Sequence, residues 1–175
     1  MADRSADAAR AELSSPACMM HEADDAYMGY LSKDELINFL TELLEAERAG
    51  ARVTLETARA ADNPPIAELM RAVQRDEAHW CGMLTRHLWA LGVTPSDNVG
   101  AFYGKAMAIA DLGERIAFLN RGQGWVVRKL REALPRVRAD ALHADFAEML
   151  RSHETNIARA TEVMTQITIS PASTG

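Results

Sequence analysis

The sequence predicts an all-α protein folded as a four-helix bundle. Ala, Leu, Glu and Arg, which are strong helix formers, dominate its composition. Apolar residues recur about every 3.6 residues in four long stretches, as they do along one face of a helix. The links between these stretches are short, except between the second and the third. We therefore expect an up-down-down-up bundle with one long crossover between helices two and three.

Size, charge and cysteine content limit the classes of protein to consider. With 175 residues, the chain is one domain whose core needs no disulfide to hold it. A net charge of −6 argues against nucleic acid or an anionic membrane as partner, and no apolar run approaches the ~20 residues of a membrane span. Two scattered cysteines and an N-terminus without a secretion signal indicate a cytoplasmic protein with reduced thiols. Sixteen arginines against three lysines favour a bacterial origin.

The first two helices are marked by their end signals. Ser32 and Glu35 form a capping box, in which each side chain binds an amide at the helix end. The helix that they open should run to about Ala61. Asn63 then caps a second helix, which a glycine stops at Gly92. Because only a few residues separate them, the two helices are expected to pack as an antiparallel pair.

The second half of the chain repeats this arrangement after a longer link. Residues 93–105 carry a proline and two glycines, and they are too many for a tight hairpin, so we expect them to cross the end or the side of the bundle. Helix three covers roughly 106–134. Gly122 and Gly124 are unfavourable inside it, which indicates a close approach of another backbone. Helix four follows from about 139 to 167.

The two ends of the chain lack helical periodicity. Residues 1–30 are small and polar, so we expect a flexible N-terminal arm before a bundle of residues 31–169. Residues 170–175 are expected to form a disordered tail. The arm contains Cys18-Met19-Met20-His21, a set of side chains that suits a soft metal, although a lone cluster in a tail more often binds nothing.

Polar residues interrupt the apolar stripes at corresponding places in the two halves. Aligning the halves brings six residues into register on four helices: Glu47, Asp76, His79, Glu114, His153 and Asn156. In this register Glu45, Glu77 and Glu154 are expected to face outward. A carboxylate in a bundle core is costly unless it is paired or binds a metal. The alignment therefore predicts a buried site where all four helices contribute.

With these residues in place, the chain resembles the ferritin-like superfamily of the bacterioferritin and rubrerythrin type over residues 32 to 167. The run Leu43-Leu44-Glu45-Ala46-Glu47 is similar to the first helix of bacterioferritins, in which the second glutamate is a metal ligand. In this superfamily two helices each supply a glutamate, and two supply Glu-x-x-His, to a di-iron or di-manganese site. The resemblance implies that Glu47 and Glu114 are the two single glutamates.

The same resemblance implies that helix two supplies Asp76 and His79, with aspartate in place of the usual glutamate. Helix four departs further, because His153 stands where the family has glutamate and Asn156 where it has histidine. Three carboxylates and two histidines suit iron, manganese or zinc. One ion, or two unevenly held ions, is favoured over a standard ferroxidase centre. The alternative is a degenerate site that binds no metal, in which Asp76 and His153 form a salt bridge.

These residues support two principal hypotheses of function. The first is a metal-binding protein of the ferritin-like type that acts as an oxidase, a peroxidase or a metal-handling protein, with oxygen or peroxide as its small-molecule partner. The second is a metal-free helical interaction or stress-related module. A weaker third hypothesis, oxygen-dependent modification of RNA or a lipid, is disfavoured by the acidic charge. Whether the chain is an enzyme stays open, and we expect a homodimer because many proteins of this fold associate.

Overall fold

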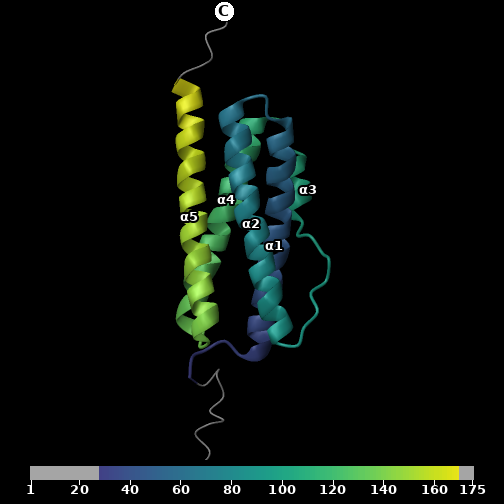
Figure 1. Cartoon of the computed structure of the whole chain (residues 1–175), viewed down its shortest axis with the longest axis vertical. Helices are drawn as coiled ribbons and strands as arrows, with labels where there is room; N and C mark the ends of the chain where they lie inside the picture. Colours follow the sequence, from purple (N-terminus) through teal and green to yellow (C-terminus); the bar gives the residue numbers. More distant parts are fainter. Residues whose placement is uncertain (1–27, 170–175) are drawn as a thin grey trace, which may run out of the picture.

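A computed structural model describes residues 28–169 of the chain, and within that range it contains helices and loops but no strand (Figure 1). The helices, with one short 3-10 turn labelled η2, are α1 (Lys33–Ala60), α2 (Pro64–Ala90), α3 (Phe102–Met107), α4 (Leu112–Ala133), η2 (Leu134–Arg136) and α5 (Asp140–Ile169). The predicted all-α four-helix bundle is confirmed. The expected N-terminal arm, with Cys18-Met19-Met20-His21, and the expected C-terminal tail lie outside the described residues, apart from residues 28–30.

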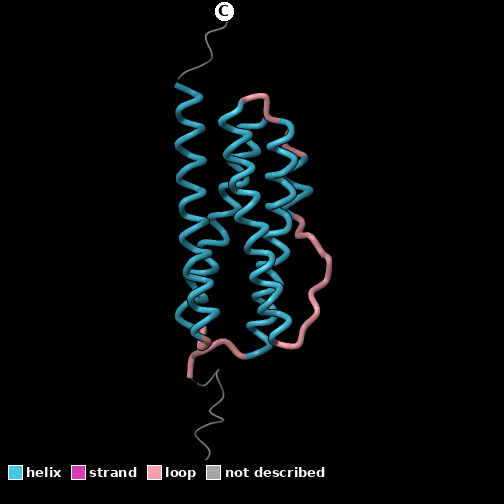
Figure 2. The backbone as a smooth tube through the Cα atoms, viewed as in Figure 1, coloured by secondary structure: helices cyan, strands magenta, loops and turns pink. Residues whose placement is uncertain are grey.

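The four long helices follow the predicted up-down-down-up order. α1 packs against α2 and α4, and α5 packs against α4 and α2, so α1 and α5 face each other diagonally across the core. The crossover between α2 and α4 runs along the outside of the bundle (Figure 2). Its last part, α3, lies against α1 and α4. None of the helices described between residues 33 and 169 is both long enough and apolar enough to cross a membrane.

The predicted start of helix three is wrong, and the reason is a capping residue. We expected a continuous helix from residue 106, but α3 ends at Met107 and α4 begins only at Leu112. Asp111 adopts an extended backbone, and its carboxylate accepts a hydrogen bond from the N–H of Glu114 at 2.8 Å. This side chain satisfies an amide that a helix end would otherwise leave free, so the chain restarts its helix here.

Gly122 makes room for the crossover on α4, but the group that it admits is a side chain and not the backbone that we expected. A Cβ atom at this position would lie 2.7 Å from the ring of Phe102. The Phe102 ring also stacks on Phe118, with 4.8 Å between the ring centroids. The same explanation is wrong for Gly124, where an added Cβ would meet only the Arg128 side chain, at 3.8 Å.

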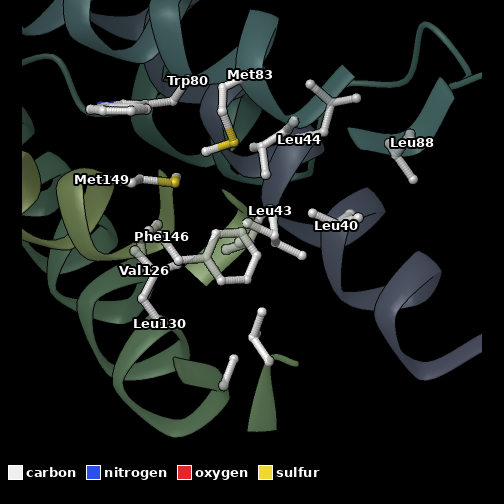
Figure 3. Close-up of a cluster of buried hydrophobic side chains, with 14 residues drawn as sticks. Leu40, Leu43, Leu44, Trp80, Met83, Leu88, Val126, Leu130, Phe146 and Met149 are labelled. Atoms are coloured by element: carbon white, nitrogen blue, oxygen red, sulfur yellow. The ribbon is translucent and has the colours of Figure 1, made fainter. Parts of the chain in front are cut away.

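The hydrophobic core is divided into two clusters along the bundle axis. One cluster contains Leu43, Leu44, Phe146, Met149 and Trp80, and Figure 3 shows these side chains gathered in one group. The other lies beyond it along α1 and α5 and includes Val53 and Ala160. On α1 and α5 the residues between the two clusters are partly polar. This gap between the clusters is where the candidate site lies.

Candidate functional site

Four polar side chains, one from each long helix, lie buried between the two hydrophobic clusters. They are Glu47 on α1, Glu77 on α2, Gln123 on α4 and His153 on α5, and each is at most 3% exposed. All four line one cavity. We call this set the buried polar layer. Burying four polar groups is costly unless each finds a partner, so their interactions determine what the site can do.

Glu47 and His153 form a direct pair across the diagonal of the bundle. The Nε2–H of His153 donates to Glu47 Oε1 at 3.1 Å, and its Nδ1–H donates to the carbonyl of Met149 at 3.0 Å. Burial opposes the charged imidazolium, but the neighbouring carboxylate and the Met149 carbonyl outweigh it, so the pKa of His153 is raised. A protonated imidazole is the form that can donate to both acceptors at once.

The carboxyl group of Glu77 packs against α1 at Gly50, where any residue with a Cβ atom would collide with it. A Cβ atom at Gly50 would lie 2.6 Å from both carboxyl oxygens of Glu77. The hydroxyl of Thr54 is 3.5 Å from the same carboxyl group. Burial, and then the charge of Glu47, raise the pKa of Glu77 well above its usual range, although Thr54 lowers it. These surroundings therefore favour the protonated form of the Glu77 carboxyl group over its carboxylate.

Two acceptors of the buried polar layer are not satisfied by the described protein. Glu47 Oε2 and Gln123 Oε1 are buried and have no hydrogen-bond partner within residues 28–169. Leaving such a buried acceptor unsatisfied costs about 1–3 kcal/mol, and more if it is charged. A bound ligand or ion that engages these oxygens would remove that cost.

The cavity beside the buried polar layer has a volume of about 290 Å³ and lies between α1 and α4. The end of the crossover covers it with Gly100, Ala101 and Phe102. This cover is fastened to α1, because Arg48 donates to the Ser96 carbonyl. The N–H of Gly100 also donates to the carbonyl of Glu45 at 3.2 Å. The long crossover therefore builds one wall of the site.

The structure brings together only part of the predicted site. Glu47 and His153 meet, as the aligned halves predict. Asn156 is buried as well, but its Nδ2 donates to Asp76 Oδ2 at 3.0 Å, away from the cavity. Asp76 is half-buried and His79 is exposed. With Asn156 they line a shallow depression on the outer face between α2 and α5.

The prediction for helix two is wrong by one residue. We expected Asp76, His79 and Trp80 to face inward and Glu77 to face outward. Trp80 is buried as expected, but Glu77 is buried in place of Asp76, and His79 is exposed. A shift of one residue rotates a side chain by about 100° around a helix, which is enough to exchange core and surface. The spacing of Val73, Glu77 and Trp80 also fits one helical face, so the sequence contains a signal for the correct register.

The prediction that Glu114 belongs to the buried site is also wrong. Glu114 is exposed in the first turn of α4. The residue of α4 that reaches the level of Glu47 is Gln123, nine positions later, or about 13 Å along a helix. Sequence reasoning missed Gln123 because it sought a carboxylate, and missed Glu77 because it chose the neighbouring aspartate.

The donor groups are too few for the expected five-ligand cluster. Among residues 28–169, no three His, Cys, Asp or Glu side chains are gathered in a way that could hold a metal ion. The buried polar layer supplies two carboxyl groups and one imidazole, and its fourth member is the neutral amide of Gln123.

The order and packing of the four long helices define a ferritin-like fold. A solved structure described as ferritin-like, diiron-carboxylate proteins from Bacillus anthracis str. Ames has the same fold, with a TM-score of 0.54 and 18% sequence identity, over 78% of this chain and 95% of that chain. The chain belongs to the family described as Domain of unknown function (DUF6306), which matches residues 34–162. No curated protein matches it.

Proposed function

We propose that the buried polar layer binds one divalent transition-metal ion through Glu47, Glu77 and His153, and that the protein is an oxidase, a peroxidase or a metal-handling protein. The observation that carries this proposal is the buried pair of Glu47 and His153, whose Oε1 and Nε2 atoms lie 3.1 Å apart, with Glu77 lining the same cavity. As they stand, the three side chains are not gathered closely enough to hold an ion, so binding requires the carboxyl group of Glu77 to turn towards the pair. Glu47 Oε2, one of these donors, finds no partner in the described part of the chain. Such a donor set suits iron, manganese or zinc.

Two features of the surroundings favour the binding of an ion, and the charge of the ligands favours a single one. His153 donates its Nδ1–H to the Met149 carbonyl, and metal-binding histidines commonly fix their second nitrogen in this way. Gly50 leaves room for the carboxyl group of Glu77. An ion would displace the protons on Glu77 and His153, since metal ligands bind in their deprotonated forms. Two carboxylates would then balance the charge of one divalent ion.

The same residues do not fit a pair of ions. A paired site of the ferritin-like type uses four carboxylates and two histidines, with one carboxylate and one histidine in each of two Glu-x-x-His motifs. Here Trp80 stands three residues after Glu77, and Asn156 stands three residues after His153, so neither position offers an imidazole. Gln123 adds no negative charge. Of the two stoichiometries that the sequence allows, we propose the single ion.

A bound iron or manganese ion would supply redox chemistry with oxygen or peroxide. The chain contributes a ligand set fixed by three rigid helices and an adjoining cavity that limits the size of any reactant. Because Glu47 and His153 are each at most 2% exposed and both line the cavity, the cavity is the route by which water or a reactant would approach the donor atoms.

The proposal is tested by measuring metal content. Protein stripped with a chelator is incubated with Fe²⁺, Mn²⁺ or Zn²⁺, freed of unbound metal and analysed by elemental mass spectrometry. We expect one ion per chain, and a loss of binding in Glu47→Gln and His153→Gln. Matched controls are His79→Gln and Glu114→Gln, which change exposed residues and should keep the wild-type content. No retained metal, or two ions per chain, would overturn the single-ion site.

A second candidate is a metal-free helical interaction or stress-related module. The direct hydrogen bond between Glu47 and His153 favours it, because the pair already compensates two buried charges without an ion. This function predicts that Glu47→Ala and His153→Ala keep the cellular activity. A complementation experiment in which both variants fail would count against it.

Assembly as a homodimer in the cytoplasm is a further part of the proposal. Leu55 on α1 is 36% exposed and Trp89 on α2 is 61% exposed, and apolar side chains of this size are common interface contacts. Sedimentation analysis of the full chain tests it, and a monomer at micromolar concentration would contradict it.

A further inference from the structure

The cavity between α1 and α4 has the chemical character of a binding site for a small cation with an apolar body. Its walls include the side chains of Phe102, Leu119, Trp125 and Val126. In the described part of the chain, no lysine or arginine lines it. Small-molecule sites combine apolar walls with a few polar groups that fix orientation, and the buried polar layer supplies such groups at the inner end.

Carboxylates surround the outer end of this cavity as well. Glu42 and Glu45 line it near the crossover. Lys129 neutralises Glu42 at 2.8 Å, whereas Glu45 forms no ion pair with any residue from 28 to 169. Glu42 and Ala101 are exposed, so the cavity opens to the surface at this end. A cation entering there approaches the negative charge of Glu45.

Two buried acceptors at the inner end require hydrogen-bond donors. Gln123 is 3% exposed and Glu47 is 2% exposed, and both line the cavity. One oxygen of each, Gln123 Oε1 and Glu47 Oε2, lacks a partner among the residues that the structure covers. An alcohol brings one donor, whereas a primary ammonium brings three and also a positive charge. The ammonium group therefore matches this pair of acceptors better.

We propose that this cavity binds a small primary alkylammonium ion, with its head group donating to Gln123 Oε1 and Glu47 Oε2 and its alkyl chain against Phe102 and Trp125. The volume of about 290 Å³ lies just below the range for pockets that bind drug-sized molecules, so a small ligand fits it. The inference goes beyond the proposed metal site and does not depend on it, but both would use Glu47 Oε2, so a metal ion and an ammonium group would exclude each other at this atom.

The test uses n-butylammonium chloride as probe, with n-butanol and sodium butyrate as the neutral and anionic analogues of the same length. The full chain is titrated in the presence of EDTA, so a failure of the metal proposal does not affect the result. Binding is followed by NMR through the side-chain amide of Gln123. Because hydrogen bonds from a charged donor are about twice as strong as neutral ones, we expect butylammonium to bind about tenfold or more tightly than butanol. Butyrate should not bind.

Three variants separate this site from non-specific binding. Gln123→Leu keeps the size of the side chain but removes its acceptor, and it should weaken butylammonium binding about tenfold. Ala46→Phe fills the cavity and should abolish binding. The control is Asn120→Leu on the same helix, because Asn120 Oδ1 is also buried without a partner among the described residues but lies outside this cavity. These variants and the wild type are followed through the backbone amides of the cavity walls, since Gln123→Leu lacks the reporter amide.

The outcomes decide the proposal in either direction. A preference for butylammonium that is lost in Gln123→Leu and Ala46→Phe but kept in Asn120→Leu supports it. Gln123→Glu, which adds a negative charge at the inner end, should tighten binding and gives a second support that does not depend on a loss. No saturable binding of butylammonium, equal binding of butanol, or binding that survives Ala46→Phe overturns it.

Discussion

The carboxyl group of Glu77 on α2 lies against the backbone of Gly50 on α1, at a distance that leaves no room for a Cβ atom. Both carboxyl oxygens would be 2.6 Å from such an atom. This contact fixes which face of α2 meets α1. It also places a second acid next to Glu47, three residues before Gly50 on the same helix. Because Gly50 has no side chain, α2 can pack on α1 in this register, and Glu77 can enter the candidate site.

Gly50→Ala should destabilise the fold, because the new methyl group overlaps the carboxyl group of Glu77. Overpacking of this kind costs about 1–3 kcal/mol, measured as the free energy of unfolding in urea. In a Glu77→Ala background the same substitution should be neutral or stabilising. Gly82→Ala is the control, because an added Cβ there meets nothing closer than 3.7 Å and should stabilise α2 by up to about 1 kcal/mol. Equal effects of Gly50→Ala in both backgrounds would contradict the contact.

Glu77 should make the protein less stable as the pH rises. Burial, and next the charge of Glu47, raise its pKa well above the usual 4.5. At a pH between the usual pKa and the folded-state pKa, Glu77 has lost its proton in the unfolded chain but keeps it in the folded chain. The free energy of unfolding therefore falls as the pH rises through this range. Glu77→Gln removes this proton exchange. In EDTA, the variant should match the wild type near pH 4 and exceed it near pH 8.

The matched control for this pH series is Glu68→Gln on the exposed side of α2, which should keep the wild-type dependence. Urea unfolding at several pH values, followed by circular dichroism, gives the slope for each protein. A wild-type slope in Glu77→Gln would show that Glu77 ionises normally in the folded protein.

Sequence reasoning succeeds here where the signal is local or repeated over many residues. The capping box at Ser32 and Glu35 is present as predicted, because its hydrogen bonds join residues three apart. The order of the long helices follows from link lengths and from the period of the apolar stripes. Glu47 is identified correctly as buried, since the residues around it on α1 leave only one consistent face.

The register of α2 could not be decided from its own residues. Asp76 and Glu77 are adjacent acids about 100° apart on the helix, and His79 and Trp80 follow with the same ambiguity. The choice between the two pairs depends on where α2 docks on α1, and that is set by the bare backbone of Gly50. This is a contact between residues 27 positions apart, which no periodicity within α2 contains.

The error at Glu114 has a different cause, and it leads to a prediction about Asp111. The start of α4 is set by the Asp111 cap, so Asp111→Ala should lower the free energy of unfolding by about 1 kcal/mol. Glu114→Gln should cost less, because its exposed carboxylate interacts only with the helix dipole, worth about 0.3–1 kcal/mol. Urea unfolding of both variants is the measurement. A Glu114→Gln cost larger than that of Asp111→Ala would restore a buried role for Glu114.

Cys81 should be nearly inert towards thiol reagents although it is only half-buried. Burial, and next the charge of Glu47, raise its pKa to about 12. At pH 8 such a thiol has on the order of a thousandfold less thiolate than an ordinary cysteine, and the thiolate is the reactive form. Alkylation by iodoacetamide is measured by mass spectrometry in Cys18→Ser protein, which leaves Cys81 as the one thiol. Unfolding in urea supplies the control, because it should restore ordinary reactivity. Rapid modification of the folded protein at pH 8 would show that burial and the charge of Glu47 do not suppress the Cys81 thiolate.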